Sequence, residues 1–164
     1  PAGARDGFLG TLCGTVSPRG DVYIGSIYDS GWLGGPNIGD VVRLRPNGKL
    51  PVGLSEIRAA AGRFRLTFTA PIDRTSAARP DNYEIVGYTR KWQGAYATPD
   101  SGRHALAVER VVVADDGRAV ELVTGEQQTG HVYEIHCGRI GPPTQPELWP
   151  AVGHYTFTAV PDRP

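Results

Sequence analysis

Residues 63–83 read RFRLTFTAPIDRTSAARPDNY, and this stretch decides the fold class of the chain. Phe64, Leu66 and Phe68 alternate with polar residues, which is the period-two pattern of a half-buried β-strand. Pro71 cannot donate a hydrogen bond to a neighbouring strand, so the strand has to end there. The stretch therefore predicts one strand of a sheet that buries a single face.

A short helical turn and a second strand are predicted to follow. Asp73 is placed to cap a single turn over residues 76–78, and Pro80 closes that turn. Asn82 and Tyr83 then begin the next strand, YEIVGY. This order of strand, capped turn and strand is common in extracellular β-sandwich modules.

Composition extends the all-β prediction to the whole chain. The 164 residues suffice for one domain with a core, or for one domain and an appendage. The 22 glycines and 14 prolines fit many short strands joined by turns. The 17 basic and 17 acidic residues are interspersed, which argues against a nucleic acid or an anionic membrane as partner. No apolar run approaches the roughly 18 residues of a membrane span.

The chain contains no methionine and begins with Pro1, so we expect it to be a segment of a longer polypeptide. Its two cysteines, Cys13 and Cys137, both lie in strand-like surroundings. An even pair in an exported β-protein is compatible with one disulfide, which would tie the N-terminal segment to the rest. The alternative is two buried free thiols.

Two regions are predicted, and the first is residues 1–50, a β-strand appendage. Short strands, GFLGTLCGTV, DVYIGSIY and DVVRL, are separated by a turn at 17–20 and by the loop DSGWLGGPNIG, with a tight turn at Asn47-Gly48. This spacing resembles one blade of a β-propeller. A single blade cannot bury both of its faces, so it has to pack on something else.

The second region, residues 51–164, is predicted to be an immunoglobulin or fibronectin-III-like sandwich of about seven short strands. LSEIRAAA has helical propensity, but it is short and a clear strand follows it, so we predict a strand there. The clearest hairpin is ALAVERVVVADDGRAVELV, which turns at Asp116-Gly117. EIVGYTRKW, HVYEIHC and HYTFTAV are further strands, and the proline-rich GPPTQPELWP is an irregular loop.

The order of these pieces resembles a known family. LTFTAPIDRTSAARPDNYEI, YTRKW, VERVVVADDGRAVEL, TGHVYEIHCGRI and HYTF followed by AVP look like the C-terminal module of large exported proteins from planctomycete-type bacteria. In those proteins a sorbosone-dehydrogenase-like β-propeller precedes the module, and a c-type haem domain is often attached. The segment GDVYIGSIYDSGWLGGPNIGDVVRLRPNGK is similar to the last propeller blade.

The resemblance implies a periplasmic, cell-surface or secreted location, neighbouring domains of the parent polypeptide as partners, and a parent acting in sugar oxidation or polysaccharide use. It supplies no catalytic residues for this module. The haem motif C-x-x-C-H is absent, because Cys13 precedes Gly14 and Cys137 precedes Gly138. We therefore expect no cofactor in this segment.

Metal binding has only weak candidates. His131 and His136 are five residues apart on one predicted strand, so they lie on opposite faces and cannot share an ion. A site between strands remains open, for example His136 with His154 or with Cys137, since zinc or copper accepts such ligands. Nothing in the spacing requires it.

The aromatic residues are the best functional lead. Tyr88, Arg90 and Trp92 share one strand face if the strand extends that far, and Tyr96 is close by in sequence. Trp32 and Trp149, both in predicted loops, could add to such a surface. Exposed aromatic rings beside charged donors can stack on sugar rings and bond their hydroxyls. The competing interpretation is that Trp92 is a core tryptophan of the sandwich and that Tyr88 lies under a loop.

These observations give one leading hypothesis and two alternatives. The leading hypothesis is a non-catalytic accessory module of an exported multidomain protein. The first alternative is a carbohydrate-binding module that uses the exposed aromatics. The second is a fragment of a propeller-type sugar dehydrogenase, in which DSGWLGGPN forms one wall of an active site.

Overall fold

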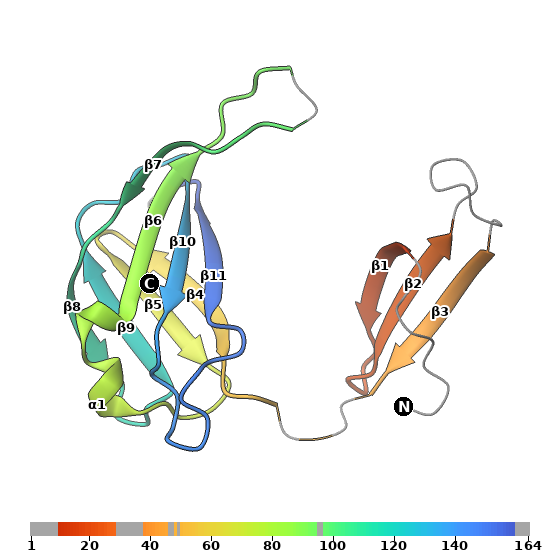
Figure 1. Cartoon of the computed structure of the whole chain (residues 1–164), viewed down its shortest axis with the longest axis horizontal. Helices are drawn as coiled ribbons and strands as arrows, with labels where there is room; N and C mark the ends of the chain where they lie inside the picture. Colours follow the sequence, from red (N-terminus) through yellow and green to blue (C-terminus); the bar gives the residue numbers. More distant parts are fainter. Residues whose placement is uncertain (1–9, 29–37, 46–47, 49, 95–96, 160–164) are drawn as a thin grey trace. The chain divides into compact units, whose positions relative to one another are not determined.

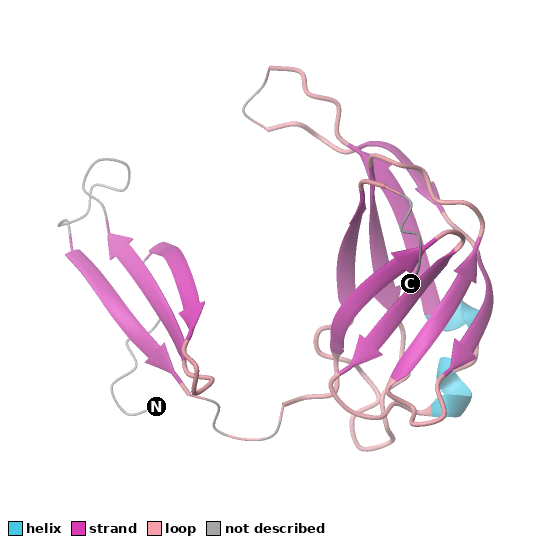
Figure 2. Ribbon diagram, turned by 180° about the vertical axis from the view of Figure 1, so that it is seen from behind, coloured by secondary structure: helices cyan, strands magenta, loops and turns pink. Residues whose placement is uncertain are grey.

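The computed structural model describes residues 10–28, 38–45, 48, 50–94 and 97–159. The chain divides into two compact units, Pro1–Leu50 and Pro51–Pro164 (Figure 1). Each unit is an antiparallel β-structure, and the only helical segments of the described residues are two short ones in the second unit (Figure 2). No helix among the described residues is long and apolar enough to cross a membrane.

The N-terminal unit is a three-stranded antiparallel sheet in the order β1-β2-β3. Its strands are β1 (Gly10–Val16), β2 (Val22–Tyr28) and β3 (Ile38–Leu44). The β1–β2 turn is closed by the Ser17 hydroxyl, which accepts the Asp21 amide N–H, and by the Gly20 amide N–H, which donates to the Ser17 carbonyl. Gly20 has φ +82°, a value that a residue with a side chain adopts only under strain.

The second unit is a sandwich of two four-stranded sheets, one ordered β11-β10-β6-β7 and the other β4-β5-β9-β8. The strands are β4 (Leu54–Ala60), β5 (Arg63–Phe68), β6 (Tyr83–Thr89), β7 (Ser101–Ala105), β8 (Val108–Val113), β9 (Ala119–Thr124), β10 (His131–Cys137) and β11 (Val152–Phe157). The predicted all-β sandwich is confirmed. Lettered A to G along the chain, with β7 as C′, the sheets read G-F-C-C′ and A-B-E-D, the strand order of immunoglobulin-type sandwiches.

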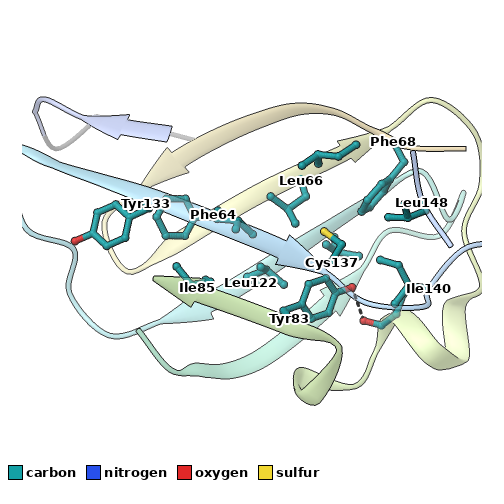
Figure 3. Packing of buried hydrophobic residues seen from close by; sticks show 14 of the residues in the cluster. Phe64, Leu66, Phe68, Tyr83, Ile85, Leu122, Tyr133, Cys137, Ile140 and Leu148 are labelled. Carbon is teal, nitrogen blue, oxygen red and sulfur yellow. Dashed lines mark hydrogen bonds between the residues drawn. The ribbon is translucent and has the colours of Figure 1, made fainter. Parts of the chain in front are cut away.

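The core lies between the two sheets and is built from the alternation that the sequence shows. Phe64 and Leu66 of β5 are fully buried, and they meet Leu122 of β9 and Tyr133 of β10 from the facing strands (Figure 3). The Phe64 and Tyr133 ring centroids lie 5.4 Å apart. Burying such side chains contributes about 1.5–3 kcal/mol each, so this unit carries its own core.

The predicted capped turn after β5 is present as α1 (Arg74–Ala77), followed by the 3-10 turn η1 (Pro80–Asn82). The Asp73 carboxylate accepts the Ser76 amide N–H at 2.7 Å. The buried Tyr83 hydroxyl donates to the Ala77 carbonyl at 2.8 Å, which fixes the turn to the start of β6 (Figure 3).

The segment that leads into β4 is hydrogen-bonded to the segment that leads into β11. The Trp149 amide N–H donates to the Val52 carbonyl, and the Leu54 amide N–H donates to the Pro150 carbonyl, each at 2.9 Å. The Gln145 side chain completes the junction, since it accepts the Val52 N–H at 3.0 Å and donates to the Val52 carbonyl at 2.9 Å. These bonds run in the parallel sense, so β4 and β11 leave the junction in the same direction.

Candidate functional site

The structure does not place the predicted aromatic platform on one strand face. β6 ends at Thr89, so Arg90 and Trp92 belong to the loop between β6 and β7. Tyr88 lies on the outer face of the sheet, opposite Val132, yet it is only 5% exposed. The prediction of Tyr88 as a stacking surface was wrong.

The Tyr88 ring is covered by two arginines rather than open to a ligand. The guanidinium carbon of Arg103 lies 4.9 Å from the ring centroid, and that of Arg90 lies 5.9 Å from it. A guanidinium over an aromatic face is attracted by the ring quadrupole. The Tyr88 ring therefore packs against the guanidinium groups of Arg90 and Arg103.

Asp100 connects the two arginines at the foot of the β6–β7 loop. Its carboxylate accepts a hydrogen bond from Arg90 Nε at 3.0 Å and one from Arg103 Nη1 at 2.8 Å. The hydrogen bond from Arg90, followed by that from Arg103, keeps the pKa of Asp100 below its ordinary value. We call Tyr88, Arg90, Asp100 and Arg103 the arginine clamp. It closes the loop where Thr89 pairs with Ser101.

Trp92 stands beyond the clamp and is 85% exposed, so the interpretation of a core tryptophan is wrong. Its ring lies beside Gly94, where a Cβ added to the glycine would sit 3.8 Å from two ring atoms. Gly94 has φ +73°, which favours glycine at this turn. The two other predicted members, Tyr96 and Trp32, and the loop DSGWLGGPN that was predicted as an active-site wall, lie outside the described residues.

The weak metal candidates His136 and His154 do come close to one carboxylate. His136 Nε2 is 2.6 Å from Glu134 Oε1, and His154 Nε2 is 3.8 Å from Glu134 Oε2. Arg103 also donates to Glu134, at 3.1 Å. The bonds from His136 and then Arg103 lower the pKa of Glu134.

The Arg103 guanidinium, which is bonded to the same carboxylate, would compete with a metal cation for Glu134. Across residues 10–28, 38–45, 48, 50–94 and 97–159, no three His, Cys, Asp or Glu side chains are grouped to hold a metal ion. His131 lies on the other face of β10, where its ring meets that of His104 with centroids 5.6 Å apart.

The two cysteines are free thiols in this structure, so the predicted disulfide between them is not formed in it. Cys13 is exposed on β1 of the N-terminal unit. Cys137 is packed into the sandwich core, where burial raises its pKa to about 12.

Sequence reasoning missed Asp100, Arg103 and Glu134. The only local signal was the turn-rich segment after Trp92, TPDSG, which indicates a returning strand. That strand is β7, and it brings Arg103 next to β6. No spacing rule connects Glu134 with these residues, because it arrives from a strand more than thirty positions further along the chain.

Comparisons with known proteins assign no family. No protein-family model and no curated protein matches the sequence. Two solved structures of surface-layer protein SbsC are similar: rSbsC(31-844), with TM-score 0.49 and 19% identity over 66% of this chain, and SbsC domains 1-6, with TM-score 0.46 and 20% identity over 65%. This chain spans 14% of each of those chains. At these identities and TM-scores the similarity says nothing about what this chain binds or does.

Proposed function

We propose that this chain is a non-catalytic accessory part of a larger exported polypeptide concerned with sugar oxidation or polysaccharide use. Its N-terminal sheet is a blade-like layer that neighbouring sheets of that polypeptide cover. The observation that carries the proposal is the exposure of apolar side chains on both faces of this sheet.

The strand register assigns these side chains to their faces. Val16 pairs with Val22 and Val22 with Leu44, so these residues share one face. Val41 pairs with Gly25 on the opposite face, where it is 72% exposed, and Leu12 at the β1 bulge is 70% exposed. A sheet that is apolar on both faces is the pattern of an internal layer, covered on each side.

The second face also carries a hollow that a neighbour could fill. It has a volume of ≈ 410 Å³ and is lined by Leu12, Ile27 and Val41 around Gly25 and Gly39. The Cys13 sulfur also lines the hollow and lies over Gly25, where an added Cβ would sit 2.8 Å from it. An apolar side chain from a facing sheet fits such a hollow, as in sheet-on-sheet packing.

Hydrogen–deuterium exchange of the isolated chain tests this proposal. Amides of β1–β3 should exchange far faster than those of β5, β9 and β10, because the N-terminal sheet lacks its covering layers. An apolar dye such as ANS should bind the whole chain and lose most of its signal with residues 51–164 alone. Core-like protection of β1–β3 in a monomeric chain would overturn the proposal.

A second candidate function is carbohydrate binding by the sandwich. The exposure of Trp92 favours it, because an indole ring that is open to solvent can stack on the apolar face of a sugar ring. Affinity electrophoresis in gels that contain soluble polysaccharides tests this function. Retardation of the wild-type chain supports it, and unaltered migration in every gel excludes it.

A further inference from the structure

We propose that the outer face of the β4-β5-β9-β8 sheet binds a polysaccharide that carries carboxylate groups. Four exposed arginines lie on this face, and we call them the arginine face: Arg58, Arg63, Arg65 and Arg110. The inference rests on the second candidate function above. It names the class of polysaccharide and places it on a surface that does not include Trp92.

The strand register assigns the first three arginines to one face. Phe64 and Leu66 of β5 point into the core (Figure 3), so Arg63 and Arg65, which alternate with them, point away from it. Arg58 of β4 is directly opposite Arg65, and residues opposite each other in an antiparallel pair lie on the same face. These three arginines form the centre of the arginine face.

Strand β8 extends the arginine face to the far edge of the sheet. Arg110 is opposite Val123 of β9, which is in turn opposite Arg63. Glu109, which falls in the β8 register shift beside Arg110, is also exposed and reduces the positive charge at this edge. The chain has no net charge, yet its fold gathers four arginines on one side of one sheet.

Arg58 and Arg65 form a like-charge pair at the centre of this face. Residues directly opposite each other have Cβ atoms about 5 Å apart, and like charges at such positions destabilise a sheet. Glu56 forms a salt bridge with Arg58, but no carboxylate of the described residues forms one with Arg65. A ligand carboxylate between the two guanidinium groups relieves the repulsion, and the planar fork of arginine suits it.

Two carboxylates on the same face favour a sugar over an acidic peptide. Glu56 accepts a hydrogen bond from Arg58 Nε at 2.9 Å, and Glu121 accepts one from Arg63 Nη1 at 3.1 Å. A uronate ring offers a carboxylate to the arginines and hydroxyl donors to the glutamates. The side chains of an acidic peptide offer only acceptors, which Glu56 and Glu121 repel.

The arginine face also lacks the apolar centre of a protein interface. Its one exposed large apolar side chain is Val112 of β8, which is opposite Glu121 and 42% exposed. Fully buried centres of protein interfaces are apolar and poor in charged residues. The chemistry of this face therefore matches a hydrated, charged polymer.

Contacts between exposed charges are weak in water, so the ligand should be a polymer that repeats its carboxylate. Affinity for the chain then rises through many equivalent sites, whereas monomeric galacturonate should bind in the millimolar range or more weakly. Binding should weaken as salt is added, because salt screens exposed charges.

The experiment is affinity electrophoresis of the full chain in gels that contain polygalacturonate, neutral glucomannan or polyglutamate. Dissociation constants come from mobility relative to a gel without polymer, which removes the effect of a changed protein charge. Wild type should be retarded most by polygalacturonate. The double variant Arg58→Gln, Arg65→Gln should raise that dissociation constant at least about tenfold.

The matched control is the double variant Arg79→Gln, Arg139→Gln. It removes the same charge from two exposed arginines outside this face. Arg139 forms a salt bridge with Glu147, as Arg58 does with Glu56, and the exposed fractions of the two arginine side chains are 68% and 62%. The control should be retarded like wild type.

Two further variants separate the arginine fork and the glutamates from simple charge. Arg58→Lys, Arg65→Lys keeps the charge without the planar fork, so it should keep only part of the binding. Glu121→Gln should strengthen binding to polyglutamate more than binding to polygalacturonate. The unfolding midpoint of Arg58→Gln, Arg65→Gln should equal or exceed that of wild type, because the like-charge pair is gone. A lower midpoint would overturn the repulsion between Arg58 and Arg65.

The outcomes decide separate statements. No retardation of wild type by either polysaccharide excludes the carbohydrate-binding function, and the inference falls with it. Retardation by glucomannan alone keeps that function and overturns the acidic ligand. Equal binding by wild type and Arg58→Gln, Arg65→Gln, or an equal loss in the control, overturns the arginine face. Polyglutamate that binds as well as polygalacturonate at equal carboxylate concentration overturns the sugar in favour of an acidic peptide.

Discussion

The N-terminal sheet and the sandwich are built from strands of similar sequence but have opposite surroundings. β2, VYIGSIY, and β6, YEIVGY with the following threonine, are both rich in β-branched and aromatic residues. In the sandwich, Phe64 and Leu66 are fully buried, whereas in the N-terminal sheet Leu12 and Val41 are more than two-thirds exposed. The lesson is that a strand pattern reports which faces are suited to burial, and says nothing about what covers them.

Thiol reactivity provides the largest contrast between the two units. Cys13 should react with a disulfide reagent in the native chain, while Cys137 should react at least about 10³-fold more slowly, since reaching it requires an opening that costs about 5 kcal/mol or more. Its pKa of about 12 adds to the difference, because the thiolate is the reactive form. The measurement is thiol titration before and after denaturation. If no thiol reacts until a reductant is added, a disulfide has formed.

Truncation of an apolar side chain should cost much more stability in the sandwich than in the N-terminal sheet. Phe64→Ala should lower the free energy of unfolding of the sandwich by about 3–5 kcal/mol, because a fully buried ring leaves a cavity between the sheets. Val41→Ala, in the N-terminal sheet, should change the free energy of unfolding of the chain by less than about 0.5 kcal/mol. Urea unfolding followed by circular dichroism measures both. Similar losses in the two variants would mean that Val41 is covered in solution.

Removing one hydroxyl tests how the turn after β5 is held in the sandwich. Tyr83→Phe deletes the donor to the Ala77 carbonyl and leaves that acceptor buried, so stability should fall by about 1–2 kcal/mol. The N-terminal sheet should be unaffected. An unchanged urea midpoint would show that another group replaces the hydroxyl.

The smallest effect concerns pH. The hydrogen bond from the Ser76 backbone lowers the pKa of Asp73 below its ordinary value of 3.8. Its contribution to stability is therefore complete above that value and is lost as the pH falls through the lower folded-state pKa. Asp73→Ser keeps a capping oxygen that does not titrate, so it should flatten this part of the stability curve. Thermal unfolding at a series of acidic pH values measures the contribution of Asp73 to stability. Parallel stability curves for wild type and Asp73→Ser would rule this contribution out.

Sequence reasoning predicted most of the fold because local rules operate there. The alternation at Phe64 to Phe68, the Asp73 cap and the Asp116-Gly117 turn each depend on neighbours within a few residues, and all are present. β7 was missed, because SGRHA has little apolar alternation and pairs at the edge of its sheet.

The candidate site was predicted less well because it depends on contacts between distant residues. Alternation predicted that Tyr88 shares a strand face with Arg90 and Trp92, but it did not predict that Arg103 of another strand covers the Tyr88 ring. The exposure of Trp92 follows from the end of β6 at Thr89, a boundary that YTRKW does not mark. Neither contact has a signature in the linear sequence.

The junction at Val52 has a mechanical consequence. The chain enters the sandwich beside the start of β11 and runs on in the same direction as that strand, so tension applied at residues 51 and 158 acts along both strands. The force then loads several hydrogen bonds in shear at the same time, so they cannot break one after another. These are the Trp149–Val52, Leu54–Pro150 and Gln145–Val52 bonds. A module tied in this way transmits a pulling force through its backbone while its core stays closed.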